Sequence, residues 1–162
     1  MKYLVDIFTN PLIMVPVISW LTAQVIKVIL NAALTKHFSI ERLFGDGGMP
    51  SGHSATVIAF AVMCGWTFGF SGFQFAVAGI FAIVVMHDAV GVRREAGKQA
   101  KSIKQIAEII NGMILGKNEE IRTEKLKEFV GHTPLQVVFG ALLGALIAIV
   151  SIVVLKIPYA LG

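Results

Sequence analysis

Long apolar stretches alternate with polar ones along most of this chain. Four stretches consist mainly of apolar residues, at about positions 12–34, 54–70, 73–92 and 135–157. A helix needs about 20 such residues to cross the hydrocarbon core of a bilayer. The second and third stretches are separated only by Ser71 and Gly72, which indicates a tight antiparallel hairpin. The pattern therefore predicts about four transmembrane helices.

A polar segment, residues 93–131, separates the third apolar stretch from the fourth. It still has helical rhythm, because apolar residues between Ile103 and Ile114 recur at spacings of three and four. A second helix is expected to begin near Asn118 and to stop at Gly131. We expect two amphipathic helices that cap the bundle or lie on the membrane surface. The whole chain, residues 1–162, is thus predicted to be a single all-α domain, a polytopic membrane helix bundle.

Composition supports a membrane protein, and the positions of its charges predict a topology. Of the 162 residues, 56% are hydrophobic and only 15% are charged, which is far more apolar than a soluble domain. All 14 Lys and Arg residues except Lys2, Lys27 and Lys156 follow the first or the third apolar stretch. With four spans these two segments share one side, and an excess of Lys and Arg marks the cytoplasm. We therefore expect a protein of the cell membrane with both termini outside.

The net charge of +4 has the same explanation. Cytoplasmic loops and contact with anionic lipids account for it, so membrane lipids are expected partners and nucleic acid is not. The single cysteine, Cys64, lies inside an apolar stretch and fits a small buried side chain.

The first apolar stretch carries a polar stripe. Gln24, Lys27 and Asn31 are three and four residues apart and share one helix face. A lysine within a span is costly and usually faces the bundle interior, where it marks a functional site. Alternatively, Lys27 extends its side chain to the inner interface.

Two histidines stand where apolar helices are expected to begin. In GGMPSGHSA, Ser51 is a suitable N-cap, Gly52 follows it, and His53 falls in the first turn. In GHTPLQ, Thr133 and Pro134 fit the N-cap and first helical residue, and His132 precedes them. The free N–H groups of a helix start attract anions, and both starts lie on the same expected side. Two loops with ordinary caps are the plainer interpretation.

The end of the third stretch adds opposite charges. His87 and Asp88 lie near its inner end, and Arg93 and Arg94 follow. An aspartate there needs a cationic partner, and an arginine fork suits phosphate oxygens. The arginines could equally be positive-inside anchors. Asp88 and Asp46 could hold Mg²⁺, although their spacing does not require it, and the sequence has no cysteine cluster or His pair typical of zinc.

Taken together, these motifs resemble the type 2 phosphatidic acid phosphatase superfamily, which includes the vanadium haloperoxidases. Pro50-Ser51-Gly52-His53 resembles its central PSGH motif. GGMPSGHSA, DAVGVRREAGKQA and GHTPLQVVFGALLG together resemble its divergent bacterial membrane branch, over about residues 20–147.

The resemblance implies roles for particular residues and no metal or other cofactor. His132 would attack phosphorus and form a phosphohistidine, and His53 would protonate the leaving group. Ser51, Gly52 and Lys27 would contact the phosphate oxygens.

The sequence also departs from the superfamily pattern. No Arg-Pro closely follows Lys27, no Ser-Arg precedes His132, and Gln136 occupies the place of the aspartate that orients the nucleophile. Glutamine would orient the imidazole but stabilise its charged form poorly. We expect Asp88 to substitute for that aspartate, and Arg93 and Arg94 for the missing arginine. Four spans are fewer than the six usual in lipid phosphatases, so a homodimer held through Gly140-xxx-Gly144 could complete the pocket.

The function expected from these features is that of an integral-membrane phosphatase with a lipid phosphate or diphosphate as substrate. Its site would face the cytoplasm, and its mechanism would be metal-independent with a phosphohistidine intermediate. The main alternative is a non-catalytic protein that binds or transports a phospholipid or polyprenyl phosphate, which Gln136 favours. Transfer of phosphate between lipid head groups and a purely structural membrane role are two further alternatives.

Overall fold

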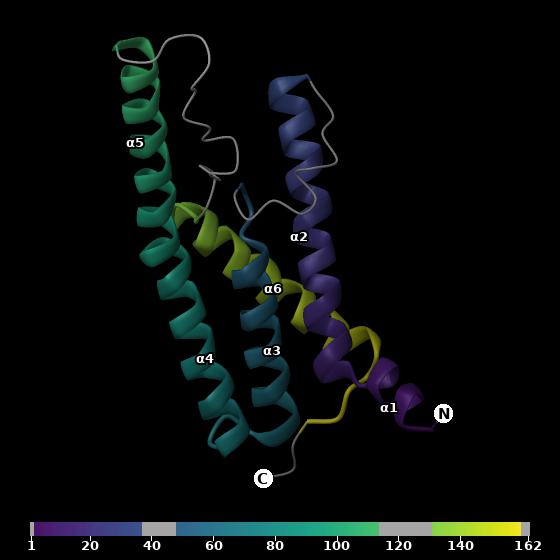
Figure 1. Ribbon diagram of the computed structural model, residues 1–162. Helices are drawn as coiled ribbons and strands as arrows, with labels where there is room; N and C mark the ends of the chain where they lie inside the picture. The colour runs from purple at the N-terminus through teal and green to yellow at the C-terminus, as the bar shows by residue number, and fades with distance from the viewer. Residues whose placement is uncertain (1, 37–47, 114–130, 160–162) are drawn as a thin grey trace.

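The computed structural model describes residues 2–36, 48–113 and 131–159, and every regular element in these ranges is an α-helix (Figure 1). The helices are α1 (Lys2–Thr9), α2 (Pro11–Thr35), α3 (Gly52–Phe68), α4 (Phe73–Val90), α5 (Val92–Met113) and α6 (Pro134–Val154). The expected all-α membrane bundle is confirmed.

The predicted spans correspond to α2, α3, α4 and α6, with ends displaced by no more than three residues. Within the described residues, α2, α6 and the apolar part of the α4–α5 segment are long and apolar enough to cross a membrane. Helix α3 is apolar but has only 17 residues. Its start is fixed by Ser51, whose side chain accepts a hydrogen bond from the Ser54 N–H.

Helix α3 is the centre of the bundle, and it packs against α2, α4 and α6. Helices α2 and α4 lie on opposite sides of it in Figure 1. Val15, Met63 and Ile152 come from α2, α3 and α6 and form one buried cluster together with Ala59 and Ala148. This cluster joins three helices into one core.

Two glycines of α6 allow the closest of these contacts. A Cβ atom at Gly140 would lie 3.0 Å from the Ser54 Cβ, and one at Gly144 would lie 2.9 Å from the Ala55 Cα. The glycine pair predicted to support a dimer therefore packs within one chain against α3. A homodimer remains a prediction, but it no longer has this motif as its support.

We expect Gly144→Ala to destabilise the bundle by about 1–3 kcal/mol, because the added methyl group would force α6 away from the α3 backbone. Thermal unfolding in detergent measures the effect. Gly79→Ala is the matched control on α4, since a Cβ there meets nothing within 4 Å. Equal melting temperatures for the two variants would contradict the close α3–α6 contact.

The polar segment 93–131 differs in part from expectation. Its first helix, α5, exists and is amphipathic, but it continues α4 beyond the bundle as one long rod with a break at Gly91 (Figure 1). Among the described helices α5 contacts only α4, so it does not cap the other helices. The second amphipathic helix expected near residue 118 lies outside the described residues.

Candidate functional site

The starts of α3 and α6 are tied to each other and to the end of α4 by backbone hydrogen bonds. The Ser51 N–H donates to the Gln136 carbonyl at 3.0 Å, which joins the first turn of α6 to the cap of α3. The His132 N–H donates to the Ala89 carbonyl at 2.9 Å. These bonds place three helix ends at one end of the bundle, as the sequence predicted from the common side of its motifs.

The two histidines meet at this junction. The ring centroids of His53 and His132 are 6.0 Å apart, with an angle of 65° between the ring planes. His132 is 2% exposed, and His53 is half-buried. Two residues that lie far apart in the sequence therefore have neighbouring side chains.

Lys27 lies in the same region and is buried, with 4% of its surface exposed. Its aliphatic stem packs against Gly48, where a Cβ atom would lie 3.0 Å from the Lys27 Cγ. The side chain thus stays inside the protein and does not extend to the surface, which excludes the snorkelling alternative. A buried cation near two histidines favours binding of an anion.

The PSGH segment forms the cap and first turn of α3. Ser51 is fully buried, and its Oγ accepts hydrogen bonds from the Ser54 N–H at 3.3 Å and from the Ser54 hydroxyl at 3.0 Å. Gly52 lies against the Trp20 indole, where a Cβ atom would come within 3.2 Å of Cδ1. The indole therefore leaves no room for a side chain at Gly52, in the first turn of α3.

Gln136 holds the His132 ring. Its Oε1 accepts a hydrogen bond from the Thr133 N–H at 3.0 Å and lies 3.2 Å from the His132 Nδ1. Because the same oxygen completes a capping box with Thr133, it faces the ring as an acceptor, and Nδ1 must carry the hydrogen. A neutral His132 then has its lone pair on Nε2, which is buried and has no hydrogen-bond partner among the described residues.

The sequence contains a local signal for this arrangement. Thr133 and Gln136 stand at the spacing of a capping box, in which the glutamine side chain turns back toward the N-cap. His132 immediately precedes that cap, so a returning glutamine side chain passes beside its ring.

The environment of His132 favours the neutral imidazole. Burial lowers the pKa of His132, and the charges of His53 and Lys27 lower it further. Two influences raise the pKa of His132 without overcoming the effect of burial: its hydrogen bond to Gln136, and the nearby Gly48 backbone. His132 therefore has an available lone pair at neutral pH.

Asp88, Arg93 and Arg94 lie beside this junction. The Arg93 Nε donates to the Asp88 Oδ2 at 2.6 Å, and both side chains are about two-fifths exposed. Gly131 packs against the backbone of Arg93 and Arg94, while the Arg94 side chain is exposed. The acceptor described for the His132 ring is the Gln136 Oε1, so the expected action of Asp88 on His132 stays a prediction. So does phosphate binding by the two arginines.

Within the described residues, no group of three or more His, Cys, Asp or Glu side chains is placed to hold a metal ion. The residues brought together are one buried lysine, two histidines, a glutamine and the start of an apolar helix. This is a donor-rich site suited to an anion at the end of a membrane bundle.

Comparison with known proteins identifies the chain as a membrane protein of the type 2 phosphatidic acid phosphatase (PAP2) type. The family described as "Divergent PAP2 family" matches residues 8–147, and the chain belongs to it. A protein from Bacillus subtilis (strain 168), named "Uncharacterized membrane protein YuiD", is 35% identical over 151 residues, which cover 90% of this chain and 96% of the relative. No solved structure matches the chain. The expected divergent PAP2 family is thus confirmed, and the relative is a bacterial membrane protein.

Proposed function

We propose that this protein is an integral-membrane phosphatase that hydrolyses a lipid phosphate or diphosphate through a phosphohistidine. The observation that carries the proposal is the pairing of the His53 and His132 rings, 6.0 Å apart, at the starts of two apolar helices. Membership of the Divergent PAP2 family supports it.

In the first step the Nε2 lone pair of neutral His132 attacks phosphorus, and the bond between phosphorus and the leaving oxygen breaks. His53, in its protonated form, transfers a proton to that oxygen, so the alcohol or shorter phosphate leaves in its protonated form. Lys27 and the first N–H groups of α3 stabilise the charge on the remaining phosphate oxygens.

In the second step water attacks the phosphorus of the phosphohistidine, and the P–N bond breaks. The now neutral His53 accepts the proton of the water, and inorganic phosphate leaves. Neutral His132 and protonated His53 are thereby regenerated, and the net reaction has replaced the bond between phosphorus and the leaving oxygen by one between phosphorus and the oxygen of water. His132 Nε2 is enclosed in the described structure, so a phosphate reaches it only after a local movement of its surroundings.

Gln136 favours a second candidate function. While His132 is phosphorylated its ring is positively charged, and the neutral amide of Gln136 stabilises that charge less than a carboxylate would. A protein that binds or transports a lipid phosphate without hydrolysing it needs the anion site but no such stabilisation. This alternative is a binding protein with the same ligand.

Phosphate release from purified protein in detergent distinguishes the two. We expect release from phosphatidic acid, phosphatidylglycerophosphate or a prenyl diphosphate that persists in EDTA and is inhibited by vanadate, an analogue of five-coordinate phosphorus. Saturable binding of these lipids with no release of phosphate from any of them would show that the protein is a binding protein and not a phosphatase. If the protein neither bound nor hydrolysed them, a lipid phosphate would not be its ligand.

The site is proposed to face the cytoplasm, with both termini outside, from the distribution of Lys and Arg. In a Cys64→Ser background, a cysteine introduced at the exposed Lys101 should resist an impermeant thiol reagent in intact cells. It should react after the membrane is permeabilised. A cysteine at the exposed Tyr3 should react in intact cells, and the reverse labelling of the two positions would invert the topology.

Gln136→Ala should lower kcat about 10- to 100-fold and change the pH profile, because His132 loses the acceptor that fixes its tautomer. Gln136→Glu should restore part of the rate. It should also move the acidic limb of the kcat/KM profile to higher pH, since a carboxylate favours the charged ring of His132. Thr133→Val is the control that weakens the same cap without removing the acceptor.

Asp88→Asn tests the competing assignment from the sequence. A loss with Asp88→Asn that exceeds the loss with Gln136→Ala would make Asp88 the residue that orients His132. The opposite order would assign that task to Gln136.

A further inference from the structure

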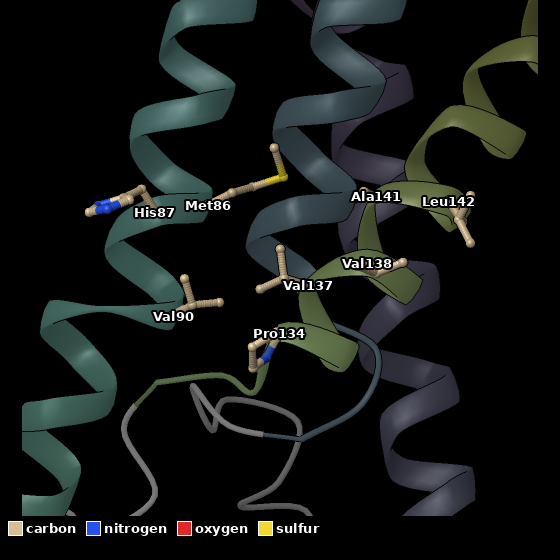
Figure 2. A pocket seen from close by; sticks show the side chains of 8 residues that line it. All are labelled: Met86, His87, Val90, Pro134, Val137, Val138, Ala141 and Leu142. Carbon is tan, nitrogen blue, oxygen red and sulfur yellow. The ribbon is translucent and has the colours of Figure 1, made fainter.

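An apolar groove separates α4 from α6 at the end of the bundle that carries the histidines. It has a volume of about 530 Å³, and its lining includes Met86 and Val90 from α4 and Pro134, Val137 and Ala141 from α6. Figure 2 shows Met86 and Val90 directed toward α6, while the His87 ring points away. The groove is thus bounded by hydrocarbon side chains of two helices whose apolar lengths suit a bilayer.

The groove and the histidine site share one short backbone segment. Val90 and Pro134 bound the end of the groove, and the His132 N–H is bonded to the Ala89 carbonyl beside them. The backbone of His132 therefore lies next to the groove, while its ring meets His53. The extended segment before Pro134 separates the two rings from the groove. A lipid whose phosphate lies at the rings can therefore place its tail between α4 and α6 if its chain crosses this one segment.

The lining suits a flexible hydrocarbon chain better than a helix of a second copy. Close helix pairs in membranes use small residues, and the two glycines of α6, Gly140 and Gly144, already contact α3. The groove face of α6 carries the branched side chains of Val137, Val138 and Leu142 beside Ala141. Its volume lies within the range of cavities that bind small molecules.

We propose that this groove binds the acyl or prenyl chain of the lipid whose phosphate lies at the His53–His132 site. The ligand is then a lipid with a long hydrocarbon tail, and a water-soluble phosphate ester lacks half of the contacts. This inference rests on the proposed function, because it takes the ligand of the histidine site to be a lipid phosphate.

Photolabelling of the wild-type protein tests the groove without requiring catalysis. The probes are phosphatidic acid and a prenyl phosphate, each with a diazirine in the hydrocarbon chain, in phosphatidylcholine vesicles. We expect adducts in peptides containing Met86–Val90 and residues 137–142, and at least five-fold fewer with phosphatidylcholine carrying the same diazirine. Equal labelling by the phosphatidylcholine probe, or no groove adducts from either phosphate probe, would overturn the inference.

Filling the groove gives an independent kinetic test. Ala141→Phe should lower kcat/KM for a long-chain lipid phosphate at least ten-fold more than for p-nitrophenyl phosphate, chiefly through KM. Ala76→Phe makes the same change at an exposed position on α4 outside the groove lining, and should alter neither value. An unchanged ratio in Ala141→Phe would count against the groove.

The two proposals fail in different ways. Groove adducts that depend on the phosphate, with no phosphate release from any substrate, would support the binding site for the hydrocarbon chain and contradict the phosphatase. Release of phosphate without groove adducts would support the phosphatase and contradict the groove as the binding site for the chain.

Discussion

His132→Ala should reduce hydrolysis of a lipid phosphate by about 10³-fold or more, because the change removes the nitrogen that bonds to phosphorus. The loss should extend to p-nitrophenyl phosphate, whose good leaving group needs no help from an acid. The same variant should fail to acquire an acid-labile phosphoryl group when the reaction is quenched in base. Rapid-quench mass spectrometry of the intact protein measures that group directly.

His53→Ala is the matched variant, because it removes the other ring of the pair. The change should lower the rate of hydrolysis about 10²–10⁴-fold with a lipid phosphate, whose alkoxide leaves poorly without a proton. The rate with p-nitrophenyl phosphate should fall much less. A phosphorylated form of this variant should still appear with the activated substrate. If the two variants lost activity equally on both substrates, the separate roles of nucleophile and acid would be wrong.

Lys27→Met should lower kcat/KM by about 10²–10³-fold, the cost of removing one charged donor that stabilises phosphate oxygens in the transition state. A second effect follows from the buried position of Lys27, because its charge helps to lower the pKa of His132. Without it the pKa of His132 rises toward its ordinary value. The acidic limb of the kcat/KM profile, where His132 becomes protonated and cannot attack, should therefore move to higher pH.

Lys27→Arg separates the two effects, since it keeps the charge and enlarges the head group. The acidic limb should stay in place, while the rate should remain below that of the wild type because the lysine stem already packs tightly against Gly48. An acidic limb that does not move in Lys27→Met would mean that Lys27 does not act on His132. If KM and kcat were unchanged in Lys27→Met, Lys27 would not contact the phosphate.

Much of the helical architecture could be predicted because its causes are local. Apolar runs in α2, α4 and α6 and the caps at Ser51 and Thr133 lie within single elements, and the observed ends follow them closely. The family could be predicted too, because its short motifs keep their residues in order. The course of α5 could not, since an amphipathic pattern shows which face is apolar but not where the helix points after Gly91.

The residues of the candidate site could be predicted from the sequence, but their contacts with one another could be predicted only in part. The sequence by itself determined that His53 and His132 begin apolar helices and that Lys27 interrupts one, because capping and hydropathy are properties of neighbouring residues. Only the tertiary structure decided that the two rings meet and that Gly140 and Gly144 pack against α3. The physical reason is that these contacts join residues of different helices or helix starts. Packing of whole helices selects among them, and no local pattern contains that choice.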